Sequence, residues 1–414
     1  MIQFDKFTLK NGLKVIVHHD PSTTIVAVNL LYNVGSRDEN PNKTGFAHLF
    51  EHLMFEGSIN IPAFDTALQM AGGENNAFTN NDITNYYITL PKENIETAFW
   101  LESDRMMSLD FSESKLKIQK NVVIEEYNQR YLNQPYGDAF LLLRPLAYKT
   151  HPYQWPTIGK DISHIKDATL QDVKDFFEHH YAPNNAILSV AGNVTTSEIK
   201  NLTEKWFGSI EERKIHKPDL PKEPKQNKPE FLQVDRNVPF DAIYKAFHMS
   251  SKLDPDYYVA DMISDILSNG KSSRLYQNLV KEQKLFSDIN AYITGDIDEG
   301  LFIVSGKLMK GNDMKDAEKA IAHELKIMAS ELIEDNELEK VKNKYESVYQ
   351  FGHISALNKA MDLAYQELLG DANRINHEVQ KYRAVRKEEV QRVAKQLFND
   401  NNSSTLHYLS NPHA

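Results

Sequence analysis

Residues 44–58 read Thr-Gly-Phe-Ala-His-Leu-Phe-Glu-His-Leu-Met-Phe-Glu-Gly-Ser. The apolar residues of this stretch recur with helical spacing, so the stretch is predicted to form a helix. His48 and His52 are four positions apart and therefore lie one turn apart on one face. Two imidazoles in this relation can bind one zinc ion. Glu51 lies on the same side of the helix, where it can reach a water at the metal without being a ligand.

The order His-x-x-Glu-His is the reverse of the familiar His-Glu-x-x-His motif, and it keeps the relative placement of two ligands and a base. With 15 histidines and 58 acidic residues in 414 positions, chance predicts fewer than about 0.1 such motifs. The alternative is a solvated helix face that happens to carry polar residues. The apolar flanks argue for a buried helix, in which His and Glu need partners; these flanks are Phe46, Phe50, Leu53, Met54 and Phe55.

A catalytic zinc ion usually has three protein ligands and one open position, so a third ligand is expected from elsewhere in the chain. The best candidate segment is residues 114–131, Ser-Lys-Leu-Lys-Ile-Gln-Lys-Asn-Val-Val-Ile-Glu-Glu-Tyr-Asn-Gln-Arg-Tyr. It offers Glu125 and Glu126 behind an apolar run. Adjacent helical residues differ by about 100° in direction, so only one of them can face the metal. The spacing alone leaves both open.

Composition narrows the possible functions further. The chain has no cysteine, which excludes disulfide frameworks, cysteine-based metal sites and thiol nucleophiles. Any metal must therefore be held by His, Asp or Glu. The formal net charge of -11 argues against a nucleic-acid partner, which would require a basic face, although an acidic surface attracts cationic peptides.

The length of 414 residues predicts two domains. Residues 213–230 contain four prolines among Lys and Glu, a composition typical of an extended linker. We therefore expect one domain at 1–212, a linker at 213–230 and a second domain at 231–414. Strand and helix patterns follow one another similarly on both sides, which predicts an α+β fold of two similar domains, each a mostly antiparallel sheet packed with helices. Residue-level similarity between the halves is weak.

The N-terminal residues alternate in polarity and show no apolar signal-peptide core, and no run approaches the roughly 18 apolar residues of a membrane span. The sequence therefore predicts no membrane span and a cytoplasmic location. A periplasmic location is the alternative if a signal peptide has been removed.

The HxxEH motif, followed about seventy residues later by Val-Val-Ile-Glu-Glu, resembles the pitrilysin family of metallopeptidases (inverzincins, M16), which includes insulysin and the mitochondrial processing peptidase. Further family landmarks extend the resemblance over nearly the whole chain; they are residues 35–39, 45–48, 73–77, 151–153, 273–276 and 364–370. The length resembles the half-size, two-domain members. The resemblance implies the LuxS/MPP-like metallohydrolase fold and a zinc-dependent endopeptidase that holds unfolded peptides in a closed chamber.

By this resemblance, one zinc ion per chain would be bound by His48, His52 and Glu126, with Glu51 as the general base. Aligning the Val-Val-Ile-Glu-Glu block selects the second glutamate, and Glu125 stays as the weaker alternative. The strand that contains Asn76, Ala77 and Phe78 resembles the family's edge strand, on which a substrate peptide lies as an added strand. The alternative for this strand is an ordinary sheet edge.

Two departures from the family pattern concern the site. Gln119 stands where the family often has a glutamate that acts on the metal site without binding the metal, and glutamine adds no negative charge near the metal. Val280 and Ser287 stand where active members usually have an Arg and a Tyr that contact substrate and oxyanion. Because such donors must be preorganised near the developing charge, we expect a heterodimer with a zinc-less homologous subunit that supplies them, a homodimer being possible.

Two other functions are weighed against the peptidase. A non-catalytic assembly or scaffold subunit of M16 type would typically have lost the zinc residues, all of which are present here. A zinc hydrolase of small molecules is the second alternative, and the predicted edge strand favours peptides over it.

Overall fold

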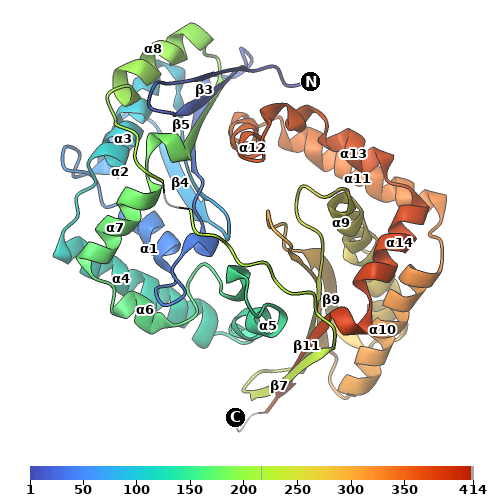
Figure 1. Cartoon of the computed structure of the whole chain (residues 1–414). Helices are drawn as coiled ribbons and strands as arrows, with labels where there is room; N and C mark the ends of the chain where they lie inside the picture. Colours follow the sequence, from blue (N-terminus) through green and yellow to red (C-terminus); the bar gives the residue numbers. More distant parts are fainter. Residues whose placement is uncertain (216, 412–414) are drawn as a thin grey trace. The chain divides into compact units, whose positions relative to one another are not determined.

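Two β-sheets organise the chain in the computed structural model, which describes residues 1–215 and 217–411 (Figure 1). The first sheet has the strand order β1-β2-β6-β3-β5-β4. Only the β2–β6 pair is parallel. The strands are β1 (Asp5–Thr8), β2 (Lys14–His19), β3 (Ile25–Tyr32), β4 (Glu74–Thr79), β5 (Thr84–Pro91) and β6 (Ala186–Gly192).

The second sheet has the order β7-β11-β8-β10-β9, and its only parallel pair is β7–β11. Its strands are β7 (Glu230–Arg236), β8 (Ala242–His248), β9 (Phe286–Ile293), β10 (Leu301–Leu308) and β11 (Ser403–Ser410). The five strands β2-β6-β3-β5-β4 of the first sheet and the five strands of the second sheet follow the same order. In each set the first strand in the sequence lies beside the last, and the second, fourth and third strands follow. This shared order agrees with the predicted α+β class and gives the predicted duplication a structural basis, with β9 as the counterpart of β4.

Helices pack on both sheets. Between the first and last strands of the first sheet lie α1 (Phe46–Leu53), α2 (Phe64–Met70), α3 (Ile95–Met107), α4 (Glu113–Tyr127), α5 (Ala139–Ala147), α6 (Ile162–Lys166) and α7 (Leu170–His180). After β6 come α8 (Thr196–Phe207), α9 (Pro255–Ser268), α10 (Met314–Ser330), α11 (Asp335–Gly352), α12 (Ala356–Leu368), α13 (Glu378–Ala384) and α14 (Lys387–Leu397).

Contacts divide the chain into two compact units that take segments from each other's part of the sequence. Unit 1 consists of residues 1–127, 155–220 and 349–377, and unit 2 of residues 128–154, 221–348 and 378–414. One of the points at which the chain passes from one unit to the other, residues 220–221, lies within the predicted linker. The boundaries at 212 and 231 assume contiguous domains, and they do not account for the two segments that pack in the other unit.

Helix α12 covers one face of the first sheet, although it comes from late in the chain. Ala360 packs on Ala27 and Ala191, where three small side chains let the helix approach the sheet closely. The Glu367 carboxylate binds Lys6 of β1 at 3.0 Å. Burial of this apolar face therefore depends on residues that follow the linker.

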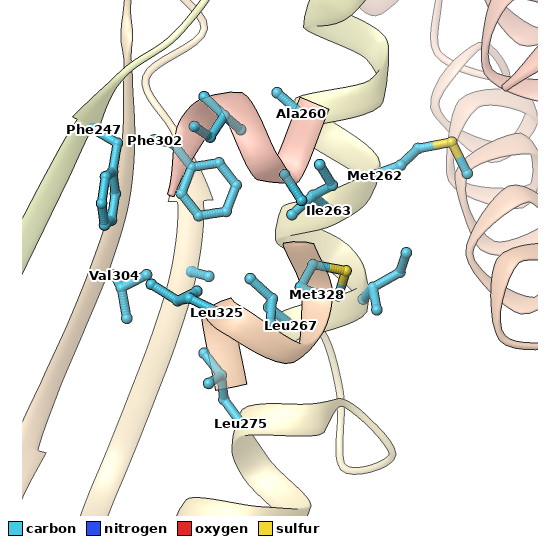
Figure 2. Packing of buried hydrophobic residues seen from close by; sticks show 14 of the residues in the cluster. Phe247, Ala260, Met262, Ile263, Leu267, Leu275, Phe302, Val304, Leu325 and Met328 are labelled. Carbon is cyan, nitrogen blue, oxygen red and sulfur yellow. The ribbon is translucent and has the colours of Figure 1, made fainter. Parts of the chain in front are cut away.

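The core of unit 2 forms between its sheet and the helices α9, α10 and α14 (Figure 2). Figure 2 shows Phe247, Phe302 and Val304 from the strands facing helical residues such as Ile263 and Leu325. This apolar packing matches the hydrophobic periodicity of the segments that form it.

In unit 1, a buried ion pair on α3 supports the region beside the histidine helix. Arg105 and Glu102 have side chains that are 1% and 0% exposed and lie 2.6 Å apart. The Arg105 guanidinium also lies 4.4 Å from the centre of the Tyr86 ring and 4.8 Å from that of Phe64. Burial raises the pKa of Glu102, while the charge and hydrogen bonds of Arg105 oppose that rise.

We expect Glu102→Leu to lower the free energy of unfolding by about 3–5 kcal/mol, because it leaves a buried guanidinium without its counter-charge. The double variant Glu102→Leu/Arg105→Met should be close to the wild type, because both charges are removed together. Urea unfolding followed by circular dichroism measures both values. Equal losses in the single and double variants would contradict this account.

Candidate metal centre

Helix α1 carries the two histidines and is fixed by aromatic packing. Phe50 is buried and its ring centre lies 4.3 Å from that of Tyr181 and 5.8 Å from that of Phe177. Gly45 precedes the helix with φ 89°, and an added Cβ would lie 2.7 Å from the Ile158 carbonyl oxygen. The first turn of α1 can therefore start here only with glycine.

The carboxylate of Glu39 caps the start of α1. It accepts hydrogen bonds from the backbone N–H groups of Gly45 at 2.9 Å and Ala47 at 2.8 Å. Burial raises the pKa of Glu39 to about 8, while these N–H donors oppose the rise. Such a cap satisfies donors that a helix N-terminus leaves unpaired. Glu39 is not among the residues that the sequence predicts for the site.

The segment before Glu39 also holds the β4–β5 turn. Arg37 NH1 lies 2.7 Å from Asp82 Oδ1, and the Ser36 N–H donates to the Asn80 carbonyl at 3.1 Å. An added Cβ on Gly35 would lie 2.4 Å from the Asn81 carbonyl oxygen. Residues 35–39 therefore tie the histidine helix to the end of the edge strand.

His48, His52 and Glu126 lie together, with one potential ligand atom from each within 4.8 Å of the others. The two Nε2 atoms are 3.3 Å apart, and Glu126 Oε2 lies 3.6 Å from that of His48 and 3.4 Å from that of His52. Around a tetrahedral zinc ion with bonds of about 2.0–2.1 Å, ligand atoms are separated by about 3.3 Å. The three separations therefore fit zinc. Among the residues that the structure describes, no other such group of three was found.

Glu126 reaches the histidines from α4, which packs against α1 (Figure 1). Val123 is fully buried, and Glu126, three residues later, is only 18% exposed in its side chain. Glu125 is exposed and is not part of the three-residue group. Of the two candidates that spacing left open, the structure brings Glu126 to the histidines.

Glu51, the predicted general base, lies on α1 between the two histidines in sequence. Its Oε2 accepts a hydrogen bond of 2.5 Å from the Thr79 hydroxyl, at the end of β4. The contact joins the histidine helix to the edge strand. Thr79 was not among the predicted site residues, although it directly follows the three strand residues that were.

Asn76, Ala77 and Phe78 lie in β4, which is the last strand in the order of the first sheet. They pair with Tyr87, Tyr86 and Asn85 of β5. Asn76 and Phe78 are exposed, whereas Ala77 and Thr79 are half-buried and point to the other face. Within the described residues, β4 therefore pairs along one edge only, with β5.

Gln119, predicted to act on the metal site without binding the metal, lies on α4, and its amide donates a hydrogen bond to Glu56 Oε1. The backbone carbonyl of Glu56 accepts a bond of 2.8 Å from the Lys115 ammonium. Glu56 follows α1 by three residues. Gln119 could therefore affect the metal only indirectly, through its contact with Glu56 in the segment that follows the histidine helix.

Replacing Gln119 with Glu is therefore expected not to strengthen zinc binding, because it places a second carboxylate against Glu56. We expect the melting temperature of the metal-free protein to fall by a few degrees, a change typical of a loss of about 1 kcal/mol. The pair Glu56→Lys/Gln119→Glu should recover it through an opposite-charge contact. Calorimetry and a zinc titration measure the two effects; a Gln119→Glu variant with tighter zinc binding would refute this expectation.

Val280 and Ser287 lie in unit 2, at the positions compared above with an Arg and a Tyr of active family members. Neither side chain carries a guanidinium or a phenol group. Val280 lies in η6 (Tyr276–Glu282) and packs against the apolar core, and Ser287 in β9 donates its hydroxyl to the Lys307 carbonyl at 3.1 Å. Both positions therefore serve local structure in this chain.

Within the described residues, none of the helices combines the length and apolarity that a bilayer crossing needs. The cytoplasmic location remains a prediction.

Comparison with known proteins places these observations in a family. Residues 14–160 match the model described as insulinase (peptidase family M16), and residues 167–345 match the model described as the peptidase M16 inactive domain. Zinc protease PqqE of Helicobacter pylori is 31% identical over 97% of this chain and 92% of that protein. The mitochondrial-processing peptidase subunit beta of Saccharomyces cerevisiae is 28% identical over 63% of this chain and 57% of that protein.

The same relationship appears among solved structures. The crystal structure of a protease from Helicobacter pylori matches with a TM-score of 0.94 and 30% identity, covering 99% of this chain and 100% of that one. The predicted family and the predicted two-domain α+β fold are both confirmed by these matches. The chain belongs to the M16 family of insulinase- and pitrilysin-like peptidases.

Proposed function

We propose that this chain is a zinc-dependent endopeptidase that hydrolyses peptide bonds in unfolded peptides or small proteins. The proposal rests on the group of His48, His52 and Glu126, whose potential ligand atoms are 3.3–3.6 Å apart. Glu51 lies on the same helix as the two histidines. The names of relatives, such as the zinc protease of Helicobacter pylori, support the same chemistry.

One zinc ion per chain would be held by the two imidazoles and the Glu126 carboxylate. Zinc in such a site supplies a Lewis acid for the substrate carbonyl and makes water acidic enough to serve as a nucleophile near neutral pH. In this proposal Glu51 takes a proton from the attacking water and passes it to the leaving amine nitrogen, as a general base and then a general acid.

The substrate would pair with the outer side of β4 along Asn76, Ala77 and Phe78. Main-chain hydrogen bonds give affinity in this mode and demand an extended peptide, which is why unfolded chains are favoured. The exposed side chains of Asn76 and Phe78 would contact the residues of the peptide. By the family resemblance, the peptide is enclosed in a chamber while it is cleaved.

The proposal includes a partner. Val280 and Ser287 carry no group that donates to an oxyanion as Arg and Tyr do, so a zinc-less homologous subunit would supply these donors. The yeast relative is named as a subunit, which supports a paired assembly. A homodimer is the alternative assembly.

Zinc analysis combined with cleavage of a peptide library tests the proposal, using the purified chain alone and mixed with a zinc-less homologue. We expect one zinc per chain, weak cleavage by the chain alone and strong cleavage by the mixture. Strong cleavage by the chain alone as a monomer would remove the partner from the proposal. A chain without stoichiometric zinc or cleavage in any mixture would favour the scaffold function. Bound zinc without peptide cleavage would favour a small-molecule hydrolase.

A further inference from the structure

We propose that Thr79 is a positioning residue that holds the Glu51 carboxylate and so links the substrate-binding strand β4 to the general base. The inference rests on the proposed peptidase function and assigns a role to a residue outside the predicted site. Thr79 would touch neither the metal nor the scissile bond, because it acts through Glu51.

The contact itself is strong. The Thr79 hydroxyl donates to Glu51 Oε2 at 2.5 Å, a length typical of an O–H group bound to an ionised carboxylate. The bond restrains one oxygen of a long side chain that has several rotatable bonds. A base that must meet a water proton within hydrogen-bond distance benefits from such a restraint.

The threonine hydroxyl has few other uses in this position. It has one proton, and its other neighbour, the Thr84 hydroxyl, lies at 3.4 Å, while Thr84 gives its own proton to the Val34 carbonyl at 3.0 Å. The shorter contact to Glu51 therefore takes the Thr79 proton. The branched side chain of Thr79 also has few rotamers, so the strand backbone determines where the hydroxyl points.

The strand is in turn held at this end by the turn that follows it. The side-chain oxygen of Asn80 accepts hydrogen bonds from the N–H groups of Asp82 at 2.8 Å and Ile83 at 2.9 Å. The backbone carbonyl of Asn80 accepts a hydrogen bond from the Ser36 N–H. Thr79 thus sits between a fixed turn and the residues that would pair with substrate. A peptide added along Asn76 to Phe78 would order the strand and, with it, the donor to Glu51.

The test uses Thr79→Val, which keeps the shape but removes the hydroxyl, and Thr79→Ser, which restores it. We expect kcat to fall about 10–100-fold in Thr79→Val with little change in KM, and to stay within about threefold in Thr79→Ser. Thr89→Val is the matched control, because Thr89 lies in the same hairpin and on the opposite face. It should behave as the wild type.

A double-mutant cycle separates positioning from general structural damage. Glu51→Asp draws the carboxylate back by one methylene group, out of reach of Thr79, so adding Thr79→Val should cause almost no further loss. Zinc content and melting temperature should be equal in all variants. Fully additive losses, an effect on KM alone, or equal losses in Thr79→Val and Thr79→Ser would overturn the proposal.

A spectroscopic readout keeps this inference separate from the proposed function. The visible absorption of the cobalt(II)-substituted protein responds to groups that hydrogen-bond around the site, so it should change in Thr79→Val and not in Thr79→Ser or Thr89→Val. An unchanged spectrum in Thr79→Val would overturn the role of Thr79. If the wild type cleaves no peptide with any partner, the proposed function fails while the cobalt result still decides this inference.

Discussion

Glu51→Gln is expected to reduce peptide hydrolysis by about 10²–10⁴-fold while the protein keeps its zinc. Glutamine has the same shape as glutamate and can still accept the Thr79 hydrogen bond, but it cannot take a proton from water. The histidines and Glu126, which hold the metal in our proposal, are untouched. The change therefore removes the proton transfer and little else.

Single-turnover hydrolysis of a fluorogenic peptide, with the partner present, measures the loss, and metal analysis of the same samples measures zinc. Glu125→Gln is the control, because Glu125 is an exposed carboxylate outside the metal group. Substantial activity in Glu51→Gln would refute the general-base role. Loss of zinc along with activity would show that Glu51 supports the metal and would leave its role as a base without support.

The second large effect is expected at the third ligand. Glu126→Gln should weaken zinc binding by more than a hundredfold, because it removes the anionic ligand from a site that has only two neutral imidazoles besides it. Changes at groups that merely contact ligands typically cost 10–100-fold, so the loss of a ligand should exceed that range. Glu125→Gln, one residue earlier on the same helix, should bind zinc as the wild type does.

Competition with a chromophoric chelator measures the affinities. Thermal unfolding gives an independent check: a ligand at about a hundred times its Kd stabilises the folded state by about 2.7 kcal/mol. Adding a chelator should therefore lower the melting temperature of the wild type and of Glu125→Gln, but not that of Glu126→Gln. The reverse pattern in the two variants would assign the third ligand to Glu125.

Much of the fold could be predicted because each element carries its own local signal. Asn11-Gly12 between alternating residues indicates the hairpin that β1 and β2 form, and the apolar spacing of residues 170–180 indicates helix α7. Helix α8 also carries a local signal in the sequence. Thr195 and Glu198 form a capping box at its start, a pattern that the sequence displays directly.

The sequence does not predict on which sheet an amphipathic helix packs. The pattern of α12 shows that it buries one face, but the same pattern fits either sheet, and only the structure shows that Ala360 meets Ala27 and Ala191. The same holds for α5, which packs on β8 and β11 in unit 2. Periodicity gives the buried face of a helix, not the identity of the surface that buries it.

The candidate metal centre depends partly on local spacing and partly on tertiary packing. The relation of His48 to His52 is a property of one helical turn, so spacing was enough. The choice of Glu126 over Glu125 depends on how α4 rolls against α1, which requires tertiary packing. The contact of Thr79 with Glu51 joins a strand end to a helix 28 positions earlier, and no local pattern encodes it.

The late position of α12 has a consequence for how the protein is made. The strands of the first sheet are complete once β6 has been synthesised, but the face that carries Ala27 and Ala191 is covered only after residues 349–377 emerge. At about 5–20 residues per second, that delay is on the order of ten seconds. The half that carries His48, His52 and Glu126 therefore keeps this apolar face exposed during that time, and a nascent chain that ends at the linker would never cover it.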